Sequence, residues 1–301
     1  MEAIVFEEFG GPEVLRSREI DAPHAGPGQV RVKVVAAGVN PMDYKVRRGW
    51  FEAMMPTTFP AVPGAEVAGV VDEAGEGAEF AVGDEVVGWA ATGGYAQHAI
   101  VGNAVLKPAG VSFEQAVAVP VAGETAQRVL DLLQVKSGET LLLHGAAGAV
   151  GAIAAQLAVA AGVKVVGTAS EANHEYLRSL GATPVAYGDG LVERVRAVAP
   201  VVDAVFDAAG FGGLEDSIEL RGTTERIVTI ADMGAGELGV EISVSGAQTD
   251  AVKTGLARQL QLAADGKLAV RVAETFPLAE AAKAQEISES GHAKGKLVLL
   301  P

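Results

Sequence analysis

The chain of 301 residues contains 38 acidic and 23 basic residues, which gives a formal charge of −15 at pH 7, and it contains no cysteine. The absence of cysteine excludes disulfides, thiolate nucleophiles and zinc sites built from thiolates. The negative charge makes nucleic acids and anionic membrane surfaces unfavourable partners, so we expect neither. The length corresponds to about two domains.

The first third of the chain has the pattern of a β-domain. Short runs rich in β-branched residues are separated by Gly and Pro turns, and each run predicts a strand. These runs are residues 2–6, 30–36, 67–71, 84–88 and 96–101. Their regular spacing is typical of a compact β-barrel, which we place at residues 1–118.

From residue 119 to 255 the pattern changes to strands that alternate with helices. A capping box of Ser112 and Gln115 precedes the first helical stretch. Strands are predicted at 140–144, 163–168, 184–187, 203–207 and 226–230, and helices at 123–133, 149–161, 171–180 and 191–198. Such alternation indicates an α/β fold with a parallel, doubly wound sheet. The last segment, 256–301, continues a helix predicted at 250–264 and adds a helix at 279–288 and a strand at 296–300.

A glycine-rich turn joins the first strand and helix of this alternation at residues 145–151, G-A-A-G-A-V-G. As a G-x-G-x-x-G pattern it has Ala146 in the first position and Gly148 and Gly151 in the other two. Gly148 would let the backbone approach a pyrophosphate, and Gly151 would let the helix pack closely on the sheet. The N–H groups expected to face the phosphate belong to the first helical residues, Ala149 and Val150. A small-residue contact without a ligand is the alternative, but the strand–turn–helix context favours a nucleotide.

The end of the next strand bears on the choice of cofactor. No acid stands at its tip to bind the adenosine ribose, and Ser170 can instead donate to a 2′-phosphate. His174 on the following helix could add positive charge. Glu171 could bind a ribose diol if the loop turned inward, and Ser170 could also act as an N-cap. We expect NADPH rather than NADH.

Several ordered motifs, together with the glycine turn, give the whole chain a resemblance to a known family. They are residues 38–45, 63–71, 82–86, 123–126, 180–182 and 295–299. The chain resembles the zinc-free medium-chain dehydrogenase/reductases, and within them the quinone (enone) oxidoreductase branch. The resemblance implies a GroES-like β-barrel catalytic domain, a Rossmann NADPH-binding domain, and a C-terminal segment that returns to the catalytic domain.

The same comparison predicts that no metal is used. Zinc alcohol dehydrogenases of this superfamily have a cysteine where Asn40 stands and a histidine where Ala65 stands beside Glu66. A catalytic zinc needs about three protein ligands, which these residues do not supply. The histidines are scattered along the chain, and we expect surface or supporting positions for all of them: His24, His98, His144, His174 and His292.

The resemblance implies hydride transfer from NADPH to a quinone or to the double bond of an α,β-unsaturated carbonyl, in a cleft between the two domains. An acceptor that is already electron-poor does not require a zinc ion as Lewis acid. Two alternatives stay open: an enoyl-thioester reductase, and a non-catalytic NADPH-binding redox sensor.

The family's nicotinamide-facing loop corresponds to residues 40–45. Tyr44 could donate a hydrogen bond or a proton to the acceptor, or it could be a rim aromatic that only stacks. Asn40 is placed with Tyr44 among the catalytic residues. The resemblance assigns Asp43 and Lys45 to the surroundings of the nicotinamide ribose, although a surface ion pair between them would explain them equally well.

The remaining cofactor contacts are carried over from the resemblance. Thr125 corresponds to a residue at the nicotinamide, with Glu124 beside it where an apolar residue is more usual. Tyr187 corresponds to an adenosine-side residue. The loops after the fourth and fifth strands and the returning tail supply the others, which are Ala209, Ile230, Ala231 and Lys294.

Location and assembly are expectations of the same kind. Residues 145–163 lack charge and approach the length of a membrane span, but the glycine turn favours a buried helix. We therefore expect a cytoplasmic protein without a membrane segment. Family habit suggests a homodimer formed through an edge strand near residues 240–244.

Overall fold

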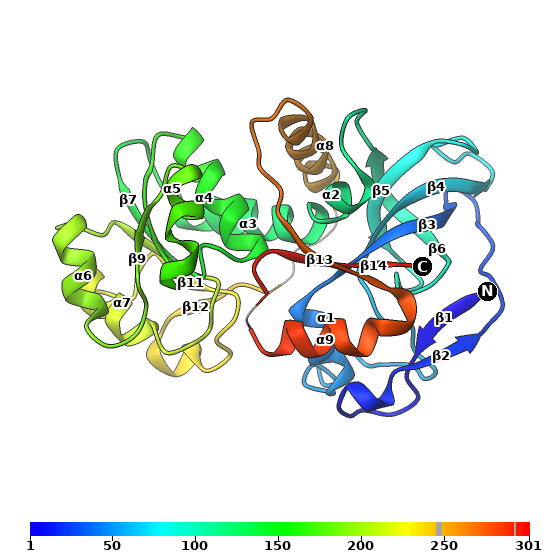
Figure 1. The fold of residues 1–301 in the computed structure, drawn as a ribbon, viewed down its shortest axis with the longest axis horizontal. Helices are drawn as coiled ribbons and strands as arrows, with labels where there is room; N and C mark the ends of the chain where they lie inside the picture. Colours follow the sequence, from blue (N-terminus) through cyan, green and yellow to red (C-terminus); the bar gives the residue numbers. More distant parts are fainter. Residues whose placement is uncertain (245–248, 292) are drawn as a thin grey trace. The chain divides into compact units, whose positions relative to one another are not determined.

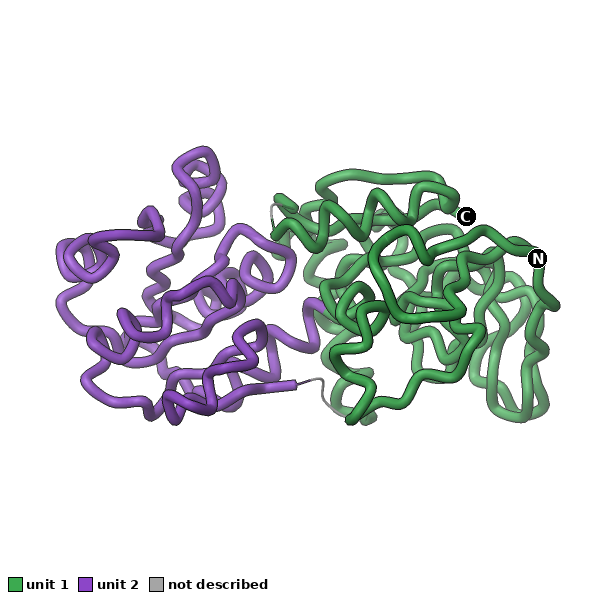
Figure 2. The backbone as a smooth tube through the Cα atoms, turned by 90° about the horizontal axis from the view of Figure 1, so that it is seen from below, with its two compact units in different colours: residues 1–121, 248–301 green, residues 122–247 purple. Residues whose placement is uncertain are grey.

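The computed structural model describes residues 1–244, 249–291 and 293–301. The chain divides into two compact units (Figures 1 and 2): unit 1 is Met1–Val121 with Gln248–Pro301, and unit 2 is Ala122–Ala247. The boundary expected after residue 255 falls inside helix α8 (Asp250–Ala264). Leu256 and Leu260 of this helix pack with Val117 in one apolar cluster, which keeps the whole helix with unit 1.

Unit 1 contains a closed antiparallel barrel, as the strand spacing predicts. Its strands are β3 (Val30–Val39), β4 (Glu66–Ala74), β5 (Glu85–Ala90) and β6 (His98–Leu106), and β6 pairs back with β3. The sheet continues from β3 through β14 (Lys296–Leu300) to β13 (Val272–Pro277). A separate two-stranded sheet is formed by β1 (Glu2–Val5) and β2 (Arg16–Glu19).

Helices and 3₁₀ turns pack around this barrel. They are α1 (Pro41–Arg47), α2 (Phe113–Val117), α8 and α9 (Ala281–Glu289), with 3₁₀ turns η1 (Pro12–Val14) and η4 (Leu278–Glu280). The capping box at α2 is confirmed, because Ser112 Oγ accepts from the Gln115 N–H at 3.2 Å and Gln115 Oε1 accepts from the Ser112 N–H at 3.2 Å. Alternate residues of β3 fill the barrel core, with Val30, Val32 and Val34 buried.

Unit 2 is a six-stranded parallel sheet in the order β12-β11-β10-β7-β8-β9. The strands are β7 (Thr140–His144), β8 (Lys164–Thr168), β9 (Thr183–Val185), β10 (Ala204–Asp207), β11 (Ile227–Thr229) and β12 (Glu241–Ile242). The helices are α3 (Pro120–Leu133), which begins at the end of unit 1, α4 (Ala149–Ala160), α5 (His174–Ser179), α6 (Leu191–Val198) and α7 (Leu214–Arg221), with 3₁₀ turns η2 (Glu171–Asn173) and η3 (Ala235–Leu238). This is the doubly wound Rossmann order, in which the chain changes direction across the sheet between β7 and β10.

Some elements depart from the sequence pattern. The strand expected at 240–244 is only two residues long: Val240 before it is buried in the core of unit 2, and the Ser243 side chain after it accepts from Arg128. The pattern did not indicate β2, α1, α7 or β13. All four residues of β2 are exposed, so no apolar alternation marks it.

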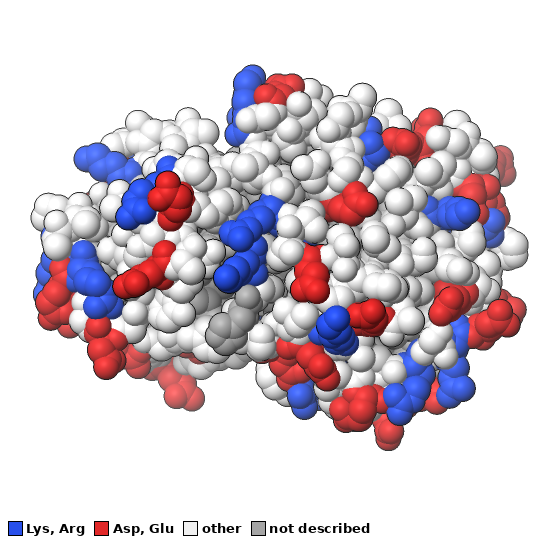
Figure 3. Space-filling model, viewed as in Figure 1, with Lys and Arg blue, Asp and Glu red and all other residues white. Residues whose placement is uncertain are grey.

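The surface charge and the lengths of the helices bear on the predictions about partners and membranes. Acidic and basic side chains are interspersed over the face shown in Figure 3. Within the described ranges, none of the helices is both long and apolar enough to cross a membrane. The uncharged segment that resembled a span forms the glycine turn and α4, whose Ala152, Ile153 and Ala155 are buried.

Candidate active site

The glycine turn of unit 2 leaves backbone N–H groups open at the start of α4. Gly148 is the N-cap and provides no side-chain capping bond, so the first N–H groups of the helix have no intrahelical partner. A Cβ on Gly151 would lie 2.3 Å from the Gly145 carbonyl oxygen. Glycine is therefore required at 151 for the close approach of helix and turn. A Cβ on Gly148 would lie 3.3 Å from its nearest neighbour, the Gly145 carbonyl oxygen, so the steric requirement for glycine is weaker at 148.

Two buried side chains hold the neighbouring loops. Asp207 Oδ1 accepts from the N–H groups of Ala209 (2.9 Å) and Gly210 (3.0 Å), while its Oδ2 accepts from Thr229 Oγ1 at 2.7 Å. Thr229 Oγ1 in turn accepts from the N–H groups of Ala231 and Asp232, each at 3.1 Å. The carried-over loop residues therefore lie partly exposed at the carboxyl ends of β10 and β11, held by Asp207 and Thr229. Sequence reasoning named these loops but not the two side chains that hold them.

His144 lies buried at the end of β7, in a supporting position as expected. The Ser217 hydroxyl donates to the Gly213 carbonyl, so it accepts from His144 Nε2–H at 2.8 Å. His144 Nδ1 is then left to accept from the Thr168 hydroxyl at 3.3 Å. Burial lowers the pKa of His144, against the raising effect of nearby Asp207 and Asp216, and the ring is neutral. It joins the ends of β7 and β8 to the segment that begins α7.

The residues expected at the adenosine end follow β8 and β9. Ser170 Oγ accepts from Asn173 Nδ2 at 3.1 Å and makes no capping bond, so its proton remains able to donate. His174 Nε2 lies 3.3 Å from the Ala169 carbonyl oxygen. Tyr187 is 61% exposed. Because β8 and β9 are parallel to β7, these residues share an edge of the sheet with the glycine turn.

Glu124, the acidic residue beside Thr125, forms an ion pair within unit 2. Glu124 Oε1 pairs with Arg128 Nε at 2.7 Å, one helical turn further along α3. Arg128 Nη1 also donates to Ser243 Oγ. The Thr125 hydroxyl lies 3.4 Å from Glu124 Oε2, a long contact. Arg128 thus compensates the charge that replaces the usual apolar residue.

Unit 1 contains a buried polar centre formed by Asn40, Glu66 and Lys296. Lys296 Nζ donates to Asn40 Oδ1 at 2.6 Å and also to Glu66 Oε1. Asn40 Nδ2 donates to the same Glu66 oxygen at 2.7 Å. All three residues are at most 6% exposed. Asn40 thus has both polar ends engaged, and the structure places it to hold its surroundings rather than to contact an acceptor.

Asp43 belongs to a second buried group, so the surface ion pair with Lys45 is the wrong interpretation. Asp43 Oδ2 accepts from the Asn40 N–H and from the Tyr95 hydroxyl, both at 2.8 Å. Burial raises the pKa of the Asp43 carboxyl to about 6, although the hydrogen bonds from Asn40 and Tyr95 act in the opposite direction. Its location also argues against a direct contact with a ribose, because the side chain is buried within unit 1.

Tyr44 and Lys45 are partly exposed residues of the same loop, in contrast to Asn40 and Asp43. The Tyr44 ring meets Trp50 edge to face, with centroids 6.0 Å apart at 84°. Burial raises the pKa of the Tyr44 hydroxyl, and the Glu289 carboxylate raises it further, so the phenol stays protonated. Burial lowers the pKa of Lys45. Lys294 is exposed in the turn before β14, whereas the lysine that the fold buries is Lys296.

The prediction that no metal is used can be examined on the side chains of Asn40, Ala65 and Glu66. Ala65 offers no side-chain ligand, and the oxygens of Asn40 and Glu66 both accept from the Lys296 ammonium. A zinc ion does not fit this set. Among the described ranges of the chain, no group of three or more His, Asp or Glu residues is placed to hold a metal ion.

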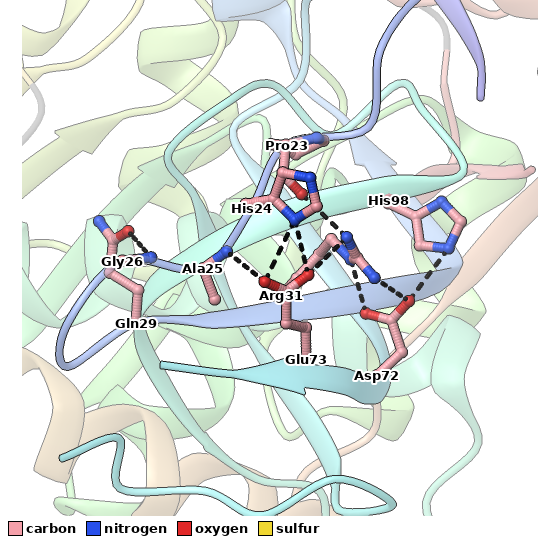
Figure 4. A network of polar contacts seen from close by, with 9 residues as sticks. All are labelled: Pro23, His24, Ala25, Gly26, Gln29, Arg31, Asp72, Glu73 and His98. Carbon is pink, nitrogen blue, oxygen red and sulfur yellow. Dashed lines mark hydrogen bonds and ion pairs between the residues drawn. The ribbon is translucent and has the colours of Figure 1, made fainter. Parts of the chain in front are cut away.

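Two of the histidines lie on the barrel surface in an ionic network (Figure 4). Arg31 pairs with Asp72 (3.0 Å) and with Glu73 (2.6 Å). His98 Nε2 lies 3.2 Å from Asp72, and His24 Nδ1 lies 3.2 Å from Glu73. Burial lowers the pKa of His98 against the raising effect of Asp72, and the Arg31 guanidinium lowers it further. His292, the fifth histidine, lies outside the described residues.

A GroES-like barrel unit combined with a Rossmann unit defines a medium-chain dehydrogenase/reductase. The family description "Alcohol dehydrogenase GroES-like domain" matches residues 26–130, and "Zinc-binding dehydrogenase" matches residues 180–299. The quinone oxidoreductase of Homo sapiens is 32% identical, over 100% of this chain and 98% of the relative. The chloroplastic NADPH-dependent alkenal/one oxidoreductase of Arabidopsis thaliana is also 32% identical, over 100% of this chain and 80% of the relative.

A solved structure agrees over the full length. Escherichia coli quinone oxidoreductase, crystallised in complex with NADPH, matches with a TM-score of 0.85 at 30% identity, with 100% of both chains covered. The chain therefore belongs to the zinc-free quinone oxidoreductase branch of the medium-chain dehydrogenase/reductases, as the sequence motifs predict. Membership of this branch makes it an oxidoreductase.

Proposed function

We propose that this protein uses NADPH to reduce quinones or the activated double bond of α,β-unsaturated carbonyls. The observation that carries the proposal is the uncapped N-terminus of α4, which lies behind a tight glycine turn at the point where strand order reverses. This position in an open α/β sheet is where nucleotide pyrophosphates bind. The E. coli relative with the same fold was crystallised with NADPH, which supports the choice of dinucleotide.

The residues around the turn fit a dinucleotide. The N–H groups of Ala149 and Val150 would hold the pyrophosphate, while Gly148 leaves room for it. Ser170 would donate to the 2′-phosphate, with His174 and Tyr187 at the adenosine side. The remaining contacts are proposed for Thr125, Ala209, Ile230 and Ala231 in unit 2 and for Lys45 and Lys294 in unit 1. When bound, NADPH supplies the hydride, and the protein supplies orientation and electrostatics.

On the acceptor side, Tyr44 is the proposed catalytic residue. Its phenol is protonated, because both burial and Glu289 raise its pKa, so it can donate to the oxygen of a carbonyl or quinone. Charge that develops on that oxygen during reduction would strengthen the hydrogen bond. Packing against Trp50 orients the ring, so the donor role and the stacking role are compatible.

Steady-state oxidation of NADPH by the purified protein tests the proposal. We expect turnover with 1,4-benzoquinones or with simple enones such as cyclohex-2-enone, and lower turnover for Tyr44→Phe without a matching loss of NADPH affinity. Turnover only with acyl-CoA substrates would assign an enoyl-thioester reductase instead. Tight NADPH binding with no turnover across the whole panel would indicate a redox sensor and contradict the proposal.

We also propose a homodimer formed through β12, which lies at the edge of the unit 2 sheet. An unpaired strand edge offers N–H and C=O groups to a second copy of the chain. Light scattering coupled to size exclusion should give twice the mass of one chain. A monomeric mass at micromolar concentration would contradict this assembly.

A further inference from the structure

The buried lysine of unit 1 is fixed by the fold rather than by local sequence. β14 pairs antiparallel with β3 in a register that places Leu297 opposite Val39, so the next residues in the same register are Lys296 and Asn40. Glu66 begins β4 on the other side of β3. A side chain at Gly38 would collide with its carboxylate, since a Cβ there would lie 2.3 Å from Glu66 Oε1. Glycine at 38 thus makes room for the acid.

The hydrogen bonds of this centre have only one consistent direction. An ammonium can only donate and a carboxylate can only accept, so Asn40 must turn its oxygen to Lys296 and its nitrogen to Glu66. The other Glu66 oxygen, Oε2, accepts from the Val121 N–H at 2.8 Å. Each side chain therefore fixes the orientation of the next, and the two opposite charges compensate each other away from water.

Asn40 connects this hydrogen-bonded centre to helix α1. It is the N-cap of the helix: its N–H donates to Asp43 Oδ2 at 2.8 Å, and its carbonyl accepts from the Asp43 N–H at 3.0 Å. The helix has only seven residues and carries Tyr44 and Lys45. A helix this short has little stability of its own and depends on such anchors.

We propose that the Lys296 ammonium is a positioning cation, which fixes Asn40 and Glu66 and through Asn40 sets the orientation of Tyr44. The inference rests on the proposed function for its effect on turnover, but not for its effect on the helix.

Removal and return of the cation provide the test. Lys296→Ala should lower kcat for the quinone or enone by about 10- to 100-fold, because a small misplacement of a reacting group has effects of that size. The NADPH dissociation constant should change much less than kcat, since the proposed pyrophosphate site, the glycine turn, belongs to unit 2. Lys267→Ala removes an exposed lysine of the same unit, which has no part in the proposed site, and this control should behave as wild type.

Chemical rescue separates charge from packing. n-Propylammonium replaces the atoms removed in Lys296→Ala and should restore part of kcat, whereas 1-propanol, of similar size but uncharged, should not. Equal rescue by both compounds, or wild-type kcat without either, would overturn the inference. If Lys296→Ala does not fold, the double variant Lys296→Met/Glu66→Gln removes both charges while conserving volume. It should fold and show the same loss of kcat, and wild-type kcat in it would also overturn the inference.

Amide hydrogen exchange tests the positioning role of Lys296 without a measurement of turnover. The Asp43 amide should exchange faster in Lys296→Ala, while amides of β7 and β10 keep their protection. Unchanged exchange at α1 would contradict the positioning role even in an active enzyme. Wild-type protein that turns over none of the acceptors would instead contradict the proposed function and leave the exchange result standing.

Discussion

The polar centre of unit 1 and the loop edge of unit 2 are built in different ways. In unit 1 a buried ammonium and a buried carboxylate are joined by an amide, and the residues lie 26, 230 and 256 positions apart in the chain. In unit 2 the groups proposed to meet the cofactor are backbone N–H groups at strand ends. Asp207 and Thr229 hold the loops there, and the neutral His144 joins strand ends to the start of α7.

This difference explains what each region can do. Backbone N–H groups at a helix start bind phosphate without a charged side chain, so unit 2 can receive an anionic cofactor although the chain carries a charge of −15. The charged centre of unit 1 is closed by its own partners and is not available to a ligand. Its contribution is to hold the short helix that presents Tyr44.

The largest effect on NADPH binding is expected from a substitution at Gly151, where helix α4 closely approaches the glycine turn of unit 2. Gly151→Val should weaken NADPH binding by at least about 100-fold, or about 2.7 kcal/mol, because the added side chain collides with the Gly145 carbonyl and displaces the start of α4. Titration of the intrinsic NADPH fluorescence measures this, with circular dichroism to confirm folding. Gly236→Ala, with nothing within 4 Å of the added Cβ, is the control. A folded Gly151→Val protein with wild-type affinity would contradict the proposed cofactor site.

The buried Asp43 carboxyl of unit 1 should make the stability of the protein depend on pH. The folded pKa of Asp43, about 6, lies above its ordinary 3.8, so the protonated form is favoured by folding. The free energy of unfolding should therefore fall by about 2–3 kcal/mol as pH rises from about 4 through 6, and this contribution should be constant above about pH 7.

The matched variant is Asp43→Asn, since one amide oxygen can accept both bonds that reach Oδ2, from Asn40 and Tyr95. Urea unfolding at several pH values should show that the variant lacks this part of the pH dependence. The same pH dependence in both proteins would show that Asp43 is not the group responsible.

A smaller effect is expected from the hydroxyl that holds the loops of unit 2. Thr229→Val conserves shape but removes the acceptor for the Ala231 and Asp232 amides and the donor to Asp207. Stability should decrease by about 1–2 kcal/mol, as for other buried hydrogen bonds left unmade. Thr183→Val, an exposed position on β9, should be neutral in the same urea titration. Equal stability of both variants would remove the argument for Thr229 as a support.

The smallest effect concerns the choice between dinucleotides. Ser170→Ala should weaken NADPH binding by about 3- to 10-fold, the typical net value of one hydrogen bond, and leave NADH affinity unchanged. The ratio of the two dissociation constants is the measurement. An equal change for both nucleotides would mean that Ser170 does not contact the 2′-phosphate.

The same comparison explains how far the sequence could be interpreted. The Rossmann unit was predictable because its glycine turn is local: Gly148 and Gly151 stand next to the strand and helix they join. The barrel strands were predictable from their alternation. Helix α1 was not, because seven residues with Asp43 and Arg47 facing inward give no apolar periodicity.

The centre of unit 1 was beyond sequence reasoning because it is assembled by strand register. The predicted strand at 296–300 includes Lys296, but nothing in the local sequence shows that its side chain is buried. Sequence reasoning assigned the cofactor contact to Lys294, which the structure leaves exposed. Only the pairing of β14 with β3 brings Lys296 to Asn40. Asn40 was singled out for what it replaces in zinc-containing relatives, while its partners depended on the fold.

The most direct test of the proposed reaction is the kinetic isotope effect with NADPH that carries deuterium at C4. Two samples, labelled on the pro-R or the pro-S side, are compared with unlabelled NADPH in the reduction of cyclohex-2-enone and 1,4-benzoquinone under single-turnover conditions. The account predicts a slower reaction with only one of the two labels, and transfer of that deuterium to the β-carbon of the enone. NADPH consumption with no isotope effect from either label and no deuterium in the enone product would contradict hydride transfer.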